Sequence, residues 1–111
     1  MTSLICSVRP ENFTEEVMAE KRLVLLIFML PDDTCPGQLK IAEDAAKKYY
    51  QDLKVGLAAE ESMETFKKKF NIIGTPTFLL TSQGEEVNRL YGVTDHKTIT
   101  HFIEQHLKAY P

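Results

Sequence analysis

The chain has 111 residues, of which 43% are hydrophobic and 26% charged, and its formal net charge is −3 at pH 7. This length and composition suit a single globular domain over residues 1–111, large enough to bury a core without disulfides or a structural metal. The mildly acidic charge provides no basic surface for nucleic acid or anionic lipid, so neither is expected as a partner.

Membrane insertion and secretion are also not expected from the sequence. The longest apolar run, Leu23–Leu30, has the length of a buried strand and is too short to span a bilayer. The N-terminus lacks a basic start followed by an apolar stretch, which is the pattern of a secretory signal. These features favour a cytoplasmic protein.

Hydrophobic spacing predicts alternating strands and helices, then a hairpin and a last helix. Strands are expected at residues 4–8, 23–29, 53–58, 77–81 and 87–91. Helices are expected at residues 13–17, 35–50, 63–70 and from Thr94 or Asp95 onward, with Ser62 as the N-cap of the third. Such an order predicts an α/β fold with a mixed sheet of four or five strands and helices on both faces.

Three short motifs follow the predicted strands in a particular order. Cys35-Pro36-Gly37-Gln38 opens a helix soon after the apolar strand, Gly74-Thr75-Pro76 precedes the fourth strand, and Gly92 follows the fifth. In this order and spacing, the chain resembles the thioredoxin family over nearly its full length. The resemblance implies a thioredoxin-like fold in which Cys35 is the nucleophilic cysteine and Pro76 a cis-proline beside it. It also implies that Thr75 offers backbone groups to an extended substrate segment, in a groove that Gly92 lines.

The chain departs from the family pattern at the residues that a dithiol mechanism uses. Gln38 stands in place of the second cysteine, Ile27 in place of a buried acid, and Leu57 at about the position of its lysine partner. A mixed disulfide at Cys35 would therefore have no local thiol to resolve it. Cys6 is expected mid-strand at the sheet edge, too far away to substitute. Dithiol thioredoxin activity is disfavoured.

Three functions remain open for such a site. In the first, Cys35 exchanges with protein or glutathione disulfides as a monothiol oxidoreductase, and an external thiol such as glutathione resolves the product. In the second, the protein is a redox-inactive module that binds extended protein segments beside Pro76, with Gln38 as a polar contact. In the third, Cys35 from two chains and external thiols hold an iron–sulfur cluster, although nothing else here supplies thiolates. We favour the first.

The reactivity of Cys35 itself stays open at this stage. A helix N-terminus stabilises a thiolate, whereas the negative charges of Asp32 and Asp33 oppose it. An inert cysteine left in an inactive site is the alternative. No metal site is expected, because the three histidines of the last helix are five residues apart and do not share a face.

Overall fold

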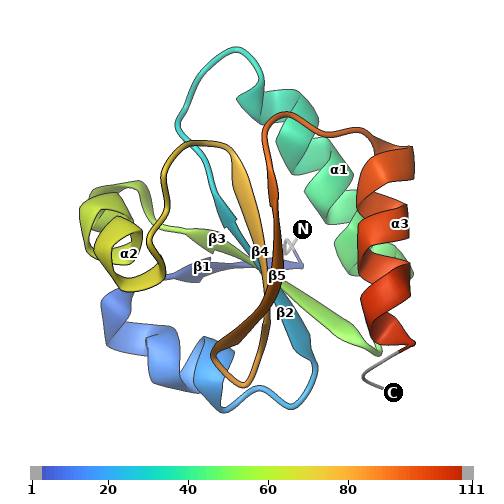
Figure 1. The fold of residues 1–111 in the computed structure, drawn as a ribbon, viewed down its shortest axis with the longest axis horizontal. Helices are drawn as coiled ribbons and strands as arrows, with labels where there is room; N and C mark the ends of the chain where they lie inside the picture. The colour runs from blue at the N-terminus through green and yellow to red at the C-terminus, as the bar shows by residue number, and fades with distance from the viewer. Residues whose placement is uncertain (1–3, 109–111) are drawn as a thin grey trace.

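The computed structural model describes residues 4–108 as a five-stranded sheet with helices on both faces (Figure 1). The strands are β1 (Ile5–Val8), β2 (Leu23–Phe28), β3 (Leu53–Ala58), β4 (Thr77–Ser82) and β5 (Glu85–Tyr91). The α-helices are α1 (Cys35–Lys48), α2 (Met63–Phe70) and α3 (His96–Leu107). Two short 3-10 helices, η1 (Pro10–Asn12) and η3 (Glu60–Ser62), and one short π-helix, η2 (Thr14–Met18), complete the set. This confirms the predicted α/β class. Among these helices, none has the length and apolarity needed to cross a bilayer.

The sheet is mixed and β2 lies at its centre. The strand order is β1-β3-β2-β4-β5, with the first three parallel and β4 and β5 antiparallel to their neighbours. All six residues of β2 are buried, as its uninterrupted apolar sequence predicts. The β4–β5 hairpin turns through Gln83 (φ 50°) and Gly84 (φ 89°), the left-handed backbone that a two-residue turn requires. The β4–β5 pairing shifts register between Leu80 and Thr81.

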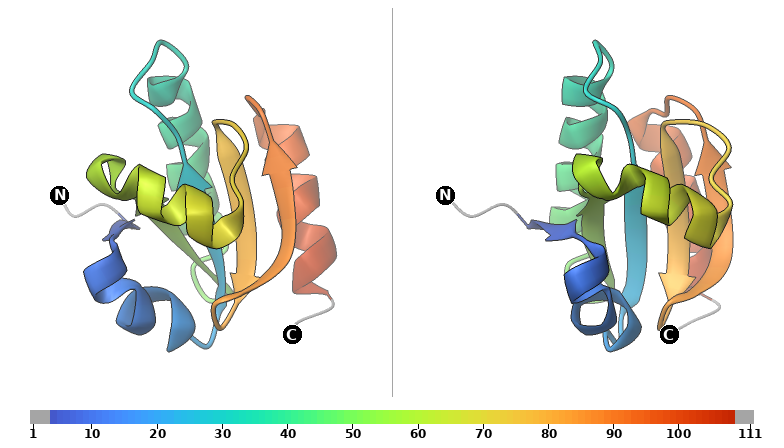
Figure 2. Two further views of the ribbon diagram at one scale, coloured as in Figure 1. Left: turned by 60° about the vertical axis from the view of Figure 1, so that its left-hand side comes forward. Right: turned by 90° about the vertical axis from the view of Figure 1, so that its left-hand side faces the viewer.

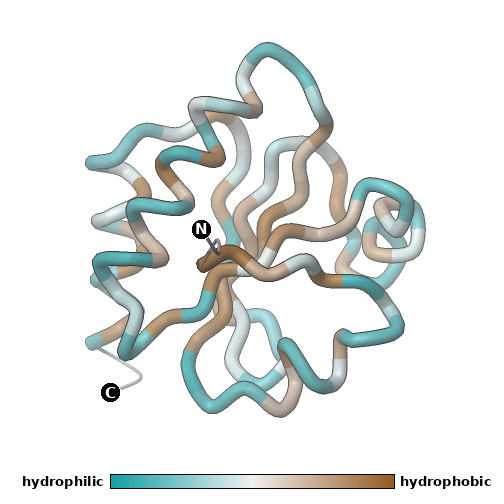
Figure 3. The backbone as a smooth tube through the Cα atoms, turned by 180° about the vertical axis from the view of Figure 1, so that it is seen from behind, coloured by the Kyte–Doolittle hydropathy of each residue, from teal (hydrophilic) through white to brown (hydrophobic). Residues whose placement is uncertain are grey.

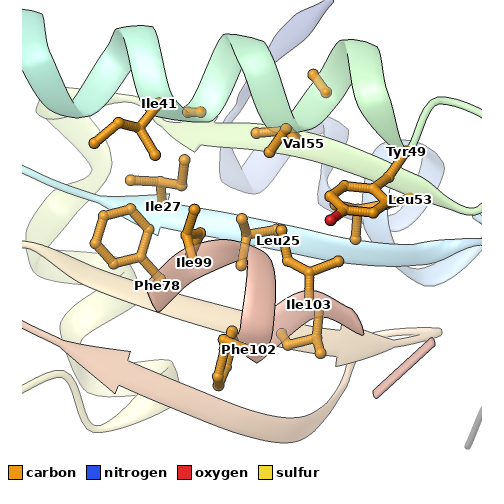
Figure 4. Close-up of a cluster of buried hydrophobic side chains, with 14 of the residues drawn as sticks. Leu25, Ile27, Ile41, Tyr49, Leu53, Val55, Phe78, Ile99, Phe102 and Ile103 are labelled. Atoms are coloured by element: carbon orange, nitrogen blue, oxygen red, sulfur yellow. The ribbon is translucent and has the colours of Figure 1, made fainter. Parts of the chain in front are cut away.

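Alternation along the strands divides the core into two layers. On one face, α1 and α3 pack against β2, β3 and β4, with Ile27, Ile41 and Phe102 among the contacts (Figure 4). On the other face lie α2 and η2 (Figure 2). They enclose Phe28 and Phe66, whose ring centroids lie 6.0 Å apart. Figure 3 shows hydrophobic residues concentrated along the central strands and hydrophilic residues along much of the outer helices and turns.

One edge of the sheet gathers the loops from five strands. Because β4 alone runs opposite to the other four strands, the ends of β1, β2, β3 and β5 and the start of β4 lie together there. The register places Thr77 opposite both Phe28 and Tyr91. The loop 29–34 is therefore central, with Arg9 and η3 to one side and segments 74–76 and 92–95 to the other. Figure 1 shows this loop in cyan at the top, close to the first turn of α1.

Three local predictions differ from the structure. The short helix around Phe13 and Val17 is a 3-10 turn followed by a π-helix, which still buries both side chains. Ser62 precedes α2, but its side chain makes no capping bond. The reason is that η3 runs directly into the helix and Ser62 lacks the extended backbone of a side-chain cap. The last strand begins at Glu85, two residues before the predicted start.

Candidate functional site

Cys35 is the first residue of α1 and is half-buried at the centre of the loop-bearing edge. The Thr34 N–H and hydroxyl donate to Asp32 Oδ1 at 2.9 and 2.6 Å, and the Cys35 N–H donates to the Asp32 carbonyl at 3.1 Å. Pro36, which has no N–H to satisfy, follows at a position that favours a helix start. These local bonds determine that α1 begins at Cys35. They also hold the pKa of Asp32 below its usual range, so a carboxylate precedes the cysteine in the turn.

Gln38, one helical turn after Cys35, is only 4% exposed. Its Nε2 donates to the Thr94 carbonyl at 3.0 Å, and the Thr94 N–H donates to its Oε1 at 3.0 Å. The side-chain amide thus pairs with both backbone polar groups of Thr94, as a neighbouring strand would. It joins α1 to the segment between β5 and α3. The sequence predicts Gln38 as a contact for a bound segment; in the structure, both polar ends of its side chain are already engaged within the chain.

Thr75, Pro76 and Gly92 lie together on one side of this site. The Thr75–Pro76 peptide bond is cis, and the Gly92 N–H donates to the Pro76 carbonyl at 2.9 Å. Gly92 has φ 88°, and a Cβ placed there would meet none of the described atoms within 4 Å. Within residues 4–108 no hydrogen bond engages the backbone of Thr75. The three residues expected to form a groove are therefore neighbours, with open space beside them.

The strands beneath Cys35 provide no proton relay. Ile27 is fully buried in the core under α1 and α3 and lies opposite Leu57 across the β2–β3 pair. An apolar pair thus occupies the two positions where the resemblance implies an acid and its lysine partner.

A pocket of about 320 Å³ lies on the other side of Cys35 from Pro76. Met29, Leu57 and Ala59 supply apolar lining, and Arg9, Glu60 and Glu61 supply charged groups. Arg9 Nη1 donates to Glu61 Oε1 at 2.6 Å. Sequence reasoning missed this pocket, because Arg9 becomes a neighbour of η3 only through the β1–β3 pairing.

Both cysteines of the chain are free thiols. Cys6 lies in the edge strand β1, and burial, with the nearby Glu16 and Glu20 charges, raises the pKa of its thiol against the opposing effect of Lys54. No group of three His, Cys, Asp or Glu side chains within residues 4–108 is placed to hold a metal ion.

Comparisons with known proteins agree with this geometry. The family model described as Thioredoxin matches residues 4–105. The chain is 26% identical over 106 residues to thioredoxin from Griffithsia pacifica, covering 95% of this chain and 97% of that protein. It is 22% identical over 106 residues to thioredoxin 1 from Synechococcus elongatus, covering 95% and 99% respectively.

Proposed function

Because the chain belongs to the thioredoxin family, we propose that it acts in thiol–disulfide exchange through Cys35 alone, as a monothiol oxidoreductase. One observation carries the proposal: Gln38, one helical turn after Cys35, is an amide tied at both ends to Thr94. The position that would hold a resolving thiol is therefore a structural brace. Cys35 stands at a helix start on the loop-bearing edge, where a disulfide can reach it.

The exchange has two steps that balance in atoms and electrons. The Cys35 thiolate attacks the glutathione sulfur of a glutathionylated protein; the new S–S bond forms as the old one breaks, and the protein thiolate leaves and takes a proton from water. A glutathione thiolate then attacks the sulfur bound to Cys35, which forms glutathione disulfide and releases the Cys35 thiolate. The exchange as a whole consumes one glutathione, whose sulfur is oxidised as it joins the transferred glutathionyl group in glutathione disulfide, while the protein sulfur is reduced to a thiol.

The apolar pair Ile27 and Leu57 fits this scheme. A dithiol enzyme has to deprotonate its second, more buried cysteine within the molecule, and a buried carboxyl is one means of doing so. Here the resolving thiol arrives from solvent as a thiolate. No buried acid is required, and its replacement by Ile27 adds to the core.

The test is turnover of a glutathione mixed disulfide with glutathione as the reductant. We expect Cys35→Ser to abolish turnover and Cys6→Ser to leave it unchanged, with circular dichroism confirming that both variants fold. Turnover that survives in Cys35→Ser would overturn the proposal. Gln38→Cys supplies a complementary measurement. Residues i and i+3 of one helical turn lie within disulfide range, so we expect an internal disulfide in this variant, seen as a loss of two hydrogens by mass spectrometry.

A second function has its own supporting observation. The exposed side chains of Ile73 (79%) and Val93 (61%) flank the segments of Pro76 and Gly92, beside the unused backbone of Thr75. This arrangement suits an extended protein segment bound without exchange. If Cys35→Ser leaves peptide binding intact, turnover is absent in the wild type, and Thr75→Trp abolishes binding, this second function holds instead.

A further inference from the structure

The pocket on the side of Cys35 away from Pro76 is lined by a thiol, by apolar side chains and by an ion pair. Cys35 lines the pocket together with the apolar side chains of Met29 and Leu57. The charged side chains of Arg9 and Glu61 also line it. These residues come from five segments that the strand order brings to one edge: the residue after β1, the loop 29–34, the first residue of α1, the end of β3, and η3. None of residues 74–76 or 92–95 lines it, so the pocket is separate from the surface beside Pro76.

The charged groups of the pocket have hydrogen-bond donors and acceptors that their own ion pair does not use. Arg9 donates from Nη1 to Glu61, and within residues 4–108 its guanidinium makes no other hydrogen bond, which leaves four N–H donors. Glu60 and Glu61 are exposed carboxylates on the same turn. A ligand group that carries both a carboxylate and an ammonium would satisfy Arg9 and these glutamates together, whereas a simple anion or a simple cation would meet a like charge.

The volume of the pocket narrows the class of ligand further. A volume of about 320 Å³ is at the lower end of the range of small-molecule sites, about 300–1,000 Å³. The pocket therefore suits a small molecule in contact with Cys35, while an extended protein segment would use the separate surface beside Pro76.

We propose that this pocket binds a small thiol that carries an α-amino acid group, as one half of the disulfide that Cys35 attacks. Glutathione is the probe for this class of ligand. This inference rests on the proposed function, since it assigns the small partner in exchange at Cys35. The Cys35 thiolate attacks one sulfur of glutathione disulfide, the new S–S bond forms, and the departing glutathione thiolate takes a proton from water. The bound glutathionyl group contacts the apolar lining residues, with its zwitterionic end at Arg9 and Glu61.

The experiment compares two disulfides on the intact chain in a Cys6→Ser background. Formation of the mixed disulfide at Cys35 is followed by intact mass with glutathione disulfide and with neutral 2-hydroxyethyl disulfide. We expect Arg9→Met to slow the first reaction about five- to tenfold, because an exposed charge-assisted contact is lost, and to leave the second unchanged. Arg9→Lys should recover part of the rate. Lys68→Met, which removes an exposed charge on α2, is the matched control and should alter neither rate.

Each outcome decides the question. If Arg9→Met slows both disulfides equally, or slows neither, the pocket assignment is wrong while exchange at Cys35 stands. If Cys35 of the wild type reacts with neither disulfide, the proposed function fails and the pocket assignment fails with it. A thermal unfolding curve for each variant separates loss of the contact from loss of the fold.

Discussion

Replacing Gln38 with methionine tests whether the residue at the second motif position is a structural brace. Methionine is similar in length and shape to glutamine but offers neither an amide N–H nor a carbonyl oxygen. The substitution therefore removes both bonds to Thr94, each 3.0 Å long, without opening a cavity at this 4% exposed position.

The magnitude follows from the two bonds and their surroundings. A typical intramolecular hydrogen bond contributes about 0.5–1.5 kcal/mol net to stability. Thr94 is half-buried, so water replaces part of what its backbone loses, while the apolar methionine gains a little from burial. We expect Gln38→Met to lower the free energy of unfolding by about 1–2 kcal/mol, which for a domain of this size lowers the Tm by about 5–10 °C.

Calorimetry and urea unfolding measure the effect, and Gln105→Met is the matched control. Gln105 is exposed on α3, so the same change there removes no buried bond and should leave the Tm almost unchanged. A Tm for Gln38→Met equal to that of the control would refute the bracing role. It would also return Gln38 to the group of residues available to a bound segment.

Three further measurements follow from the structure. Hydrogen bonds from Arg22 lower the pKa of Glu20 to about 2. The wild type should therefore unfold at a higher urea concentration than Glu20→Gln. This difference in urea midpoint should be full above about pH 5 and vanish as the pH falls toward 2. Burial is the main reason that the pKa of Tyr49 rises to about 12. The stability that the Tyr49 hydroxyl adds, measured against Tyr49→Phe, should be full below about pH 10 and disappear as the pH rises toward 12. Gly84→Ala should cost about 1–2 kcal/mol, because Gly84 has φ 89° and an added Cβ would lie 2.8 Å from Met18 Cγ. Helical Gly37→Ala, with open space around its Cβ, should instead stabilise the fold by about 0.5–1 kcal/mol. Equal effects at the two glycines would contradict this argument.

The sequence predicts the sheet well because strand burial has a clear pattern. The apolar run that ends at Phe28 can only be buried on both faces, and the structure places it at the centre of five strands. The start of α1 at Cys35 was predictable from the proline that follows it. The π-helix that ends at Met18 was not, since apolar residues four apart fit an α-helix and a π-helix equally well.

The site was predictable only where residues are close in the sequence or have a distinctive backbone. Thr75 and Pro76 form such a motif. The partner of Gln38 is Thr94, 56 residues away, and a glutamine carries no pattern that reveals whether its amide faces solvent or backbone. Arg9 follows a predicted strand, but its place in the pocket depends on β1 pairing with β3, which the apolar pattern does not specify.

The two outer strands of the sheet also bear on aggregation. An edge strand exposes backbone donors and acceptors that a second chain can extend. Here β5 carries Glu85, Glu86 and Arg89 and departs from regular register with β4, while β1 is only four residues long. A strand added at β5 would have to accommodate these charges beside an irregular ladder, and one added at β1 would gain few bonds. Both edges therefore disfavour growth of the sheet into fibrils, even when the protein is concentrated.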